Sequence, residues 1–443
     1  MKEKALFPVF LLGLALAVPL TVMVTGDDAA RRPGSSEPTA LAVELGEMFI
    51  RPSSTTVPAG SSLKVTVTNG GQTQHDLAVE GGTKSRLLNP GQSQAISFGS
   101  IDESTAFFCS VPGHREAGME MRVTVAGSAA SSSHSAEPSG SGDAASIDFS
   151  REPSDGWRPF DPKLPAAPSA RTHVIRLVAV EKEIEVAPGV RQMLWTFNGT
   201  TPGPVLRGKV GDIFDVTLTN KGTLGHSVDF HASKVAWNDE MRTIAPGESL
   251  KYRFQAKHSG IFMYHCGTAP ALHHIGNGMF GTIIIDPPGL PKVDHEYVLV
   301  QHEIYLGPQD APGDLAKMQD VAFDAVVFNG YVNQYQHAPI RVEPNQRIRV
   351  WVLDAGPSEN SAFHIVGTIF DTVYKEGAFL LRPGAARGGA QALDLQPAQG
   401  GFVEFSLDER GLYPIVTHKF ANVGKGALGL FQAGEVAAVA GGH

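Results

Sequence analysis

One short region of the chain combines the residue types that bind a redox-active metal. The segment FFCSVPGHREAGM contains Cys109, His114 and Met119, and His75 lies upstream in TQHDLAVE. Two imidazoles, a thiolate and a weak thioether are the ligands of a type 1 (blue) copper, which transfers one electron at a time. The four residues follow one another in this order within one region, so the sequence predicts such a site here.

A second region, YHCGTAPALHHIGNGM, repeats this pattern. His226 corresponds to the upstream histidine, Cys266 to the cysteine and Met279 to the methionine. In the first region four residues separate the histidine from the methionine, and the same separation here selects His274 over the adjacent His273. The sequence therefore predicts a second type 1 copper site, with His273 beside it.

A disulfide bond is the alternative explanation for the cysteines. Cys109 and Cys266 are the only two in the chain, and an exported protein with two cysteines often joins them. The repeated ligand pattern gives each cysteine an independent reason for its position. This weakens the disulfide interpretation.

The second region also carries ligand-type residues beyond the type 1 set. In HSVDFH, Asp229 and His231 are two residues apart, so in a strand they face the same side. His265 and Cys266 are consecutive and must face opposite sides. His231 and His265 are therefore predicted to face away from the first metal, toward another site.

A third repeat has lost the cysteine but keeps two histidines, His364 and His418. His418 could complete a three-histidine metal site with an open position, which is typical of a catalytic metal rather than a structural one. Asp229 and His364 would suit general acid chemistry beside such a metal. Each of these residues taken alone could equally be structural.

The same series of sequence segments recurs three times around these residues. Each copy has an alternating strand, a histidine-containing segment, a turn into a second alternating strand, and the ligand loop or its remnant. Period-two alternation, as in LKVTVTN and IFDVTLTN, indicates half-buried strands. We expect an all-β chain of three tandem Greek-key β-sandwiches, with little helix beyond a turn or two near 313–319.

The predicted domain organisation follows the repeats and the composition of the segments between them. Ser, Gly, Ala and Pro dominate the stretch after the first repeat, which predicts a flexible tether, whereas a short PPGLPKVD segment joins the second and third repeats into one body. The expected ranges are 1–34 for an export signal or membrane anchor, 40–126 for the first sandwich, 127–150 for the tether, 151–290 for the second sandwich and 291–436 for the third.

Charge and the N-terminus limit the partners and the compartment. The net charge of -9, without a basic stripe, gives no support for nucleic-acid binding. Lys2 and Lys4 precede an apolar run, which is typical of an export signal. We expect an extracytoplasmic protein, periplasmic, secreted or anchored to a membrane through its N-terminus; cleavage and retention of the signal both remain open.

The chain resembles copper-containing nitrite reductases over about residues 171–432. The resemblance rests on the segments HSVDFH, YHCG…HHIGNGMFG and VTHKF. The resemblance implies two cupredoxin domains per chain, a homotrimer, and dissimilatory one-electron reduction of nitrite to nitric oxide. The first repeat resembles a small blue-copper cupredoxin fused upstream, which would pass electrons from an external donor of unknown identity.

The resemblance also implies a role for each candidate residue, with two type 1 coppers and one type 2 copper per chain. Asp229 and His364 would deliver protons to nitrite, and Val366 would shape the substrate pocket. The implied ligands are His226, Cys266, His274 and Met279 for type 1 copper; His231, His265 and, from the adjacent subunit, His418 for type 2 copper; and His75, Cys109, His114 and Met119 for the N-terminal type 1 copper.

Two other functions would account for part of this residue pattern. A two-domain multicopper oxidase would use repeated His-x-His pairs, and the chain contains none. A non-catalytic electron carrier would explain both type 1 sites but would leave His231, His265 and His418 unused. The copper content distinguishes the carrier, with two coppers per chain, from the reductase, with three.

Overall fold

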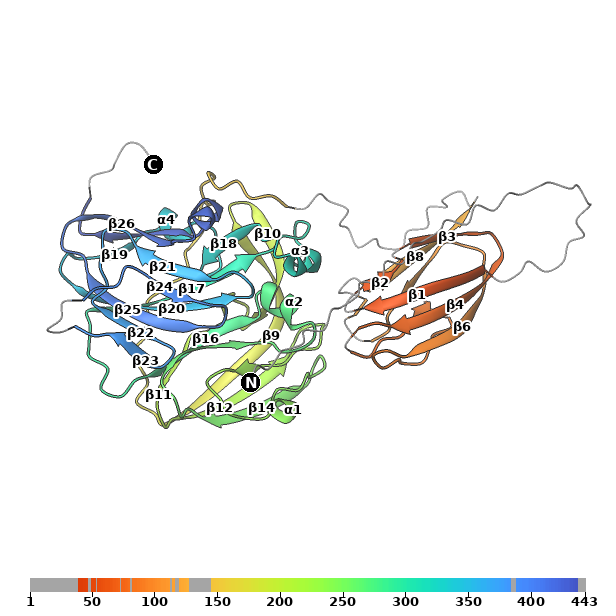
Figure 1. Cartoon of the computed structure of the whole chain (residues 1–443), viewed down its shortest axis with the longest axis horizontal. Coiled ribbons are helices and arrows are strands. Elements are labelled where there is room, and N and C mark those ends of the chain that lie inside the picture. Colours follow the sequence, from red (N-terminus) through yellow and green to blue (C-terminus); the bar gives the residue numbers. More distant parts are fainter. Residues whose placement is uncertain are drawn as a thin grey trace, which may run out of the picture.

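The computed structural model describes residues 39–46, 49–52, 54–71, 73–79, 82–111, 114–115, 119–126, 145–383 and 388–436. The described chain is mostly β, as predicted, and its six sheets pair into three β-sandwiches (Figure 1). The few helices are short, and one of them, α3 (Leu315–Gln319), falls where the sequence predicted a helical turn.

The first sandwich, red to orange in Figure 1, has sheets ordered β2-β1-β4-β6 and β3-β8-β7-β5. Its core follows the predicted alternation, because Leu63, Val65 and Val67 are fully buried on one face of β4. Its strands are β1 (Thr39–Gly46), β2 (Phe49–Arg51), β3 (Ser54–Pro58), β4 (Ser61–Asn69), β5 (Ala78–Val79), β6 (Ser93–Ile101), β7 (Thr105–Phe108) and β8 (Glu120–Ala126).

The second sandwich has sheets ordered β10-β9-β12-β14 and β11-β16-β15-β13. Phe214, Val216 and Leu218 of β12 are fully buried, again on alternate positions. The elements are β9 (Thr172–Ala187), β10 (Val190–Phe197), β11 (Leu206–Lys209), β12 (Ile213–Asn220), β13 (Asp229–Phe230), α1 (Trp237–Glu240), β14 (Ser249–Gln255), β15 (Gly260–His265), α2 (Ala271–Gly276) and β16 (Phe280–Asp286).

The third sandwich has sheets ordered β18-β17-β20-β25-β22-β23 and β19-β27-β26-β21-β24. Its elements are β17 (His295–Ile304), α3, β18 (Ala325–Phe328), α4 (Gln334–His337), β19 (Ile340–Val342), β20 (Arg347–Gly356), β21 (Ser361–Ile365), β22 (Thr372–Lys375), β23 (Ala378–Leu381), β24 (Leu393–Leu395), β25 (Gly400–Ser406), β26 (Gly411–Thr417), the 3-10 helix η1 (Phe420–Lys425) and β27 (Leu428–Ala433).

The second and third sandwiches share a hydrophobic core. Met263 and Phe280 of the second pack in one cluster with Val298, Trp351 and Phe402 of the third. Burial of this much apolar surface between two sandwiches favours a single rigid unit over two hinged domains.

The segment that precedes the second sandwich lies against this shared body. The backbone N–H of Ala145 donates to the carbonyl of Gly307 at 3.2 Å, and Ile147 and Phe149 pack beside the buried side chains of a core cluster. Residues 145–149, which fall within the range predicted as a tether, are thus packed on this body. The rest of that tether, 127–144, lies outside the described residues.

The predicted export signal or anchor, 1–34, also lies outside the described residues. Within the part of the chain that the structure describes, no helix has the length and apolar character needed to cross a lipid bilayer.

Candidate metal centres

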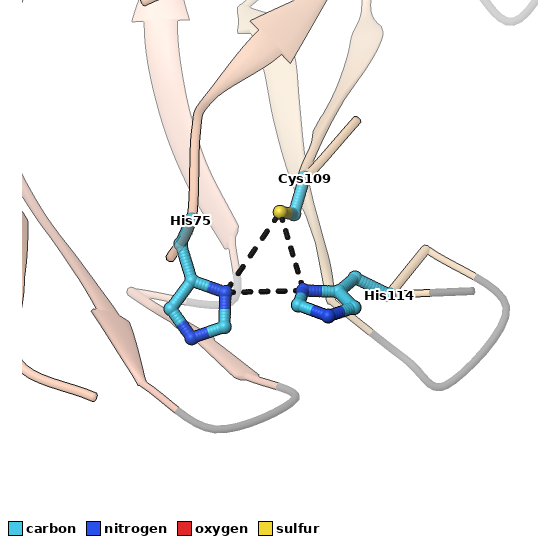
Figure 2. A group of neighbouring side chains, drawn as sticks. All are labelled: His75, Cys109 and His114. Atoms are coloured by element: carbon cyan, nitrogen blue, oxygen red, sulfur yellow. Dashed lines mark hydrogen bonds between the residues drawn. The ribbon is translucent and has the colours of Figure 1, made fainter. Parts of the chain in front are cut away.

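The first sandwich brings His75, Cys109 and His114 together at one end (Figure 2). Cys109 directly follows β7, and His75 is held by a bridge to Leu88 on the neighbouring segment. Cys109 Sγ lies 3.5 Å from His114 Nδ1 and 3.9 Å from His75 Nδ1, and the two Nδ1 atoms are 3.1 Å apart. The three donor atoms point toward one common centre.

The loop from Cys109 to Met119 is closed by two backbone hydrogen bonds. Cys109 N donates to Met119 O at 3.0 Å, and Met119 N donates to His114 O at 2.9 Å. Met119 is fully buried in the same core cluster as Cys109. The loop thus keeps the predicted methionine beside the cysteine.

The second sandwich repeats this frame. Cys266 N donates to Met279 O at 3.0 Å, and Met279 N donates to His274 O at 3.0 Å. Cys266 Sγ lies 3.3 Å from His274 Nδ1 and 4.0 Å from His226 Nδ1. The structure therefore places His274 in the cluster, whereas His273 directs Nε2 to the carbonyl of Gly313 at 3.0 Å.

Both cysteines are buried and free, so the structure gives no support to a disulfide bond. Burial raises the pKa of the Cys109 thiol to about 11. Burial also acts to raise the pKa of the Cys266 thiol, but the neighbouring imidazoles of His274 and His226 outweigh it and hold that pKa well below its usual range. Both sites combine a cysteine sulfur, which loses its proton when it binds a metal, with imidazole nitrogens, and this donor set fits copper.

A third cluster lies at the point where β13 pairs with β15. Asp229 stands opposite His265 in the register, and His231 follows β13 directly. His231 Nε2 and His265 Nε2 are 3.0 Å apart, and Asp229 Oδ2 lies 4.0 Å and 3.9 Å from them. Burial, together with the adjacent His265, lowers the pKa of His231, so the His231 ring favours the neutral form that binds a metal.

His265 and Cys266 contribute to different clusters, as strand alternation predicts. His265 meets His231, and Cys266 meets His226 and His274. The two clusters are therefore joined through one peptide bond.

The structure does not bring His364 and His418 into this third cluster within one chain. Their rings lie 5.4 Å apart on the third sandwich, where His364 belongs to β21 and His418 follows β26. The backbone N–H of His418 donates to Ala362 O at 2.7 Å, which fixes its place on the sheet. Val366, predicted to shape a pocket, is 40% exposed on the same surface.

Two acidic residues beside the type 1 clusters were not predicted. Asp76 is buried and accepts hydrogen bonds from Ser110 N at 2.6 Å and Ser110 Oγ at 2.5 Å. Glu181 of β9 lies 3.4 Å from His226 Nε2. Glu181 occurs within a long charged strand, and no local sequence signal distinguishes it from its exposed neighbours.

The fold and the clusters define a class: a chain of cupredoxin-like sandwiches with two type 1-like sites and one histidine cluster, a set that fits two type 1 coppers and one type 2 copper. The multicopper oxidase family model matches residues 179–289, within the second sandwich.

Curated relatives are more specific. The copper-containing nitrite reductase of Neisseria gonorrhoeae is 36% identical over 266 residues, covering 58% of this chain and 67% of the relative. The one from Neisseria meningitidis serogroup A is also 36% identical over 266 residues, covering 58% of this chain and 68% of the relative.

Solved structures agree with the curated relatives. A copper nitrite reductase from Nitrosomonas europaea has 34% identity and a TM-score of 0.55, covering 59% of this chain and 94% of that one. One from Thermus scotoductus has 29% identity and a TM-score of 0.53, covering 59% of this chain and 62% of that one. The chain belongs to the copper-containing nitrite reductase family, and it carries an extra N-terminal region with its own His-Cys-His-Met site.

Proposed function

We propose that this chain is a dissimilatory nitrite reductase, which converts nitrite, one electron and two protons into nitric oxide and water. The observation that carries the proposal is the third cluster, where His231, His265 and Asp229 meet one peptide bond away from Cys266. A plain electron carrier has no use for these groups. Copper, when bound, would supply one-electron redox chemistry at the cysteine sites and a Lewis acid for the anion at the histidine site.

The third ligand is proposed to come from a second copy of the chain. His418 is exposed and lies apart from His231 and His265 within one chain. Its ring lies 5.0 Å from that of Phe420, which is 59% exposed, and Ile369 on the same sandwich is 70% exposed. A contact between copies would cover these side chains, and a closed homotrimer, as the family resemblance implies, would give every copy one complete site.

Asp229 and His364 are proposed to handle the protons. Asp229 Oδ2 lies 4.0 Å from His231 Nε2 and 3.9 Å from His265 Nε2, so the carboxylate would stand beside nitrite held at this cluster and could pass it a proton. His364 directs Nδ1 to the Gln391 carbonyl, which leaves its Nε2 as the group available on the other side of the ring. Val366, two residues further along the chain, would limit the space at the substrate.

The first sandwich is proposed to act as a tethered electron donor outside the cytoplasm. A tether of the predicted composition keeps a donor at roughly millimolar effective concentration near its acceptor.

Nitric oxide release by copper-loaded protein tests the proposal, with His418→Ala and His231→Ala as inactive variants. We expect three coppers per chain in the wild type and two in each variant. Coexpression of the two variants tests the shared site directly. A mixed oligomer in which a His418→Ala copy supplies His231 and a His231→Ala copy supplies His418 would regain part of the activity. No recovery in verified mixed oligomers would contradict the intermolecular site.

A further inference from the structure

His226 has a second polar contact, on the side of the ring that faces away from the cysteine. Its Nδ1 atom lies 4.0 Å from Cys266 Sγ, and its Nε2 atom lies 3.4 Å from Glu181 Oε1. The His226 side chain is fully buried, and that of Glu181 is 15% exposed. The carboxylate is therefore largely shielded from water, and its charge acts on the ring with little screening.

Backbone groups fix Glu181 in this position. Thr223 N donates to both carboxylate oxygens, at 2.9 Å and 3.0 Å, and Leu224 N donates to Oε1 at 3.3 Å. Gly222 allows this approach, because a Cβ atom on it would lie 2.5 Å from Glu181 Oε1. The loop before His226 thus wraps around the carboxylate.

The same loop is held from its other side by Asn220. Its Nδ2 donates to Leu224 O at 2.7 Å and to Ile244 O at 3.0 Å, and Gly222 N donates to its Oδ1 at 2.9 Å. In the first sandwich Asn69 does the same, with Nδ2 donating to Thr73 O at 2.7 Å and to Leu88 O at 2.8 Å. The asparagine therefore accounts for the shape of the loop in both sandwiches, and in the second sandwich the Glu181 carboxylate adds a negative charge beside that loop.

We propose that Glu181 is a positioning residue that accepts the Nε2 proton of His226 and lowers the reduction potential of the type 1 copper in the second sandwich. An imidazole that binds a metal through Nδ1 carries its proton on Nε2, and a carboxylate there fixes the ring and makes it a better ligand. The negative charge stabilises the more positive, oxidised copper over the reduced ion.

This inference rests on the copper site of the proposed function, but its test does not use nitrite turnover. The full chain is loaded with copper in a Cys109→Ser background, so that only the second type 1 site contributes blue absorption. A redox titration of that band then gives the potential. If the Cys109→Ser chain with native Glu181 showed no blue band, the assignment of type 1 copper to the second sandwich would be overturned.

Glu181→Gln is the decisive variant, because it keeps the size and the acceptor oxygen but removes the charge. We expect the ratio of reduced to oxidised copper at a fixed applied potential to rise about tenfold, equivalent to ~59 mV for one electron. Glu183→Gln is the matched control, because Glu183 lies two residues along the same strand and pairs with exposed Arg191. It should leave the potential unchanged.

Glu181→Asp keeps the charge and should shift the potential by less than Glu181→Gln. A shift in Glu181→Gln no larger than in Glu183→Gln, with the blue band intact, would overturn the proposal. Loss of the blue band in both Glu181 variants would also overturn it, because the carboxylate would then build the loop rather than adjust the metal.

Discussion

The two type 1-like sites share a frame but have different neighbours. In the first sandwich, β5 and β7 place Ala78 opposite Phe108, the residue before Cys109. In the second, β13 and β15 place Asp229 opposite His265, the residue before Cys266. At one register position an apolar pair has thus been exchanged for a carboxylate and an imidazole.

This exchange explains how one fold supports both electron storage and chemistry. Strand alternation directs the residue before the cysteine away from the type 1 site, so its identity can change without altering the ligand loop. With Phe108 in this position the opposite face is filled by an aromatic ring, and with His265 it offers a metal ligand. The second sandwich gains a second centre at the cost of one apolar contact.

Reversing the exchange should give the largest effect. Asp229→Ala combined with His265→Phe reproduces the pair found in the first sandwich. We expect no detectable nitrite turnover and two coppers per chain instead of three, while the blue absorption of the second sandwich is retained. Metal analysis and the visible spectrum check this outcome, and loss of the blue band would show that the two faces are not independent.

Removing only the carboxylate should give the next largest effect. Asp229→Asn keeps the shape of the side chain but cannot deliver a proton, so turnover should fall by about 10²- to 10⁴-fold. Copper content should stay at three per chain, because His231 and His265 are unchanged. The wild-type rate should decrease at high pH, where proton delivery fails. An undiminished rate in Asp229→Asn would exclude the carboxylate from the reaction, and Asp215→Asn on β12 is a control for loss of one charge.

The repeats explain how much of these sites could be predicted. The ligands lie in short loops and on alternating strands, so their order and spacing record which side each one faces. His274 could be chosen over His273 because the first sandwich supplies the same spacing. The sequence thus predicted three sandwiches and the members of each cluster.

Contacts between segments that are distant in the chain could not be predicted, because they leave no regular spacing in the sequence. Glu181 reaches His226 across a loop from another strand, and Asp76 meets Ser110 across the site. Such pairs depend on how the sheets stack, and one sequence does not record that. His418 is a further case, because its proposed partners belong to another copy.

The segment 145–150, which packs on the second and third sandwiches, should give a smaller effect. A chain that begins at residue 145 lacks the first sandwich but keeps Ile147 and Phe149 against the core, whereas a chain that begins at 151 loses them. Partial burial of two such side chains contributes about 1–3 kcal/mol, which lowers Tm by roughly 2–4 °C in the shorter chain.

Both truncated chains should reduce nitrite with an artificial reductant as fast as a Cys109→Ser full-length chain. With a protein donor they should be slower than wild type, because the tethered site is missing. Equal turnover with the protein donor would refute the relay role of the first sandwich. Thermal melts of the metal-free chains compare their stability.

The smallest effect concerns the third sandwich, where Asp354 occupies the sequence position of Asn69 and Asn220. Asp354 is fully buried, and its Oδ2 has no hydrogen-bond partner among the described residues. Burial, reinforced by nearby Glu303, raises the pKa of Asp354 to about 8, and burial raises the pKa of Glu303 to about 7. Both groups bind protons in the folded chain at pH values where the unfolded chain has released them.

Stability should therefore fall as the pH rises from about 4 through 7 and 8. Asp354→Asn removes one of the two titrations, so it should raise stability at pH 8 by about 1–3 kcal/mol and flatten the pH dependence of Tm. Asn220→Asp is the reverse change in the second sandwich. It forfeits two amide hydrogen bonds and should lower Tm at pH 8 more than at pH 5. A lower Tm for Asp354→Asn at pH 8 would contradict this prediction. It would show that the fold requires the buried acid as a hydrogen-bond partner, and that Asp354 does more than occupy the position of the asparagine that shapes the ligand loops.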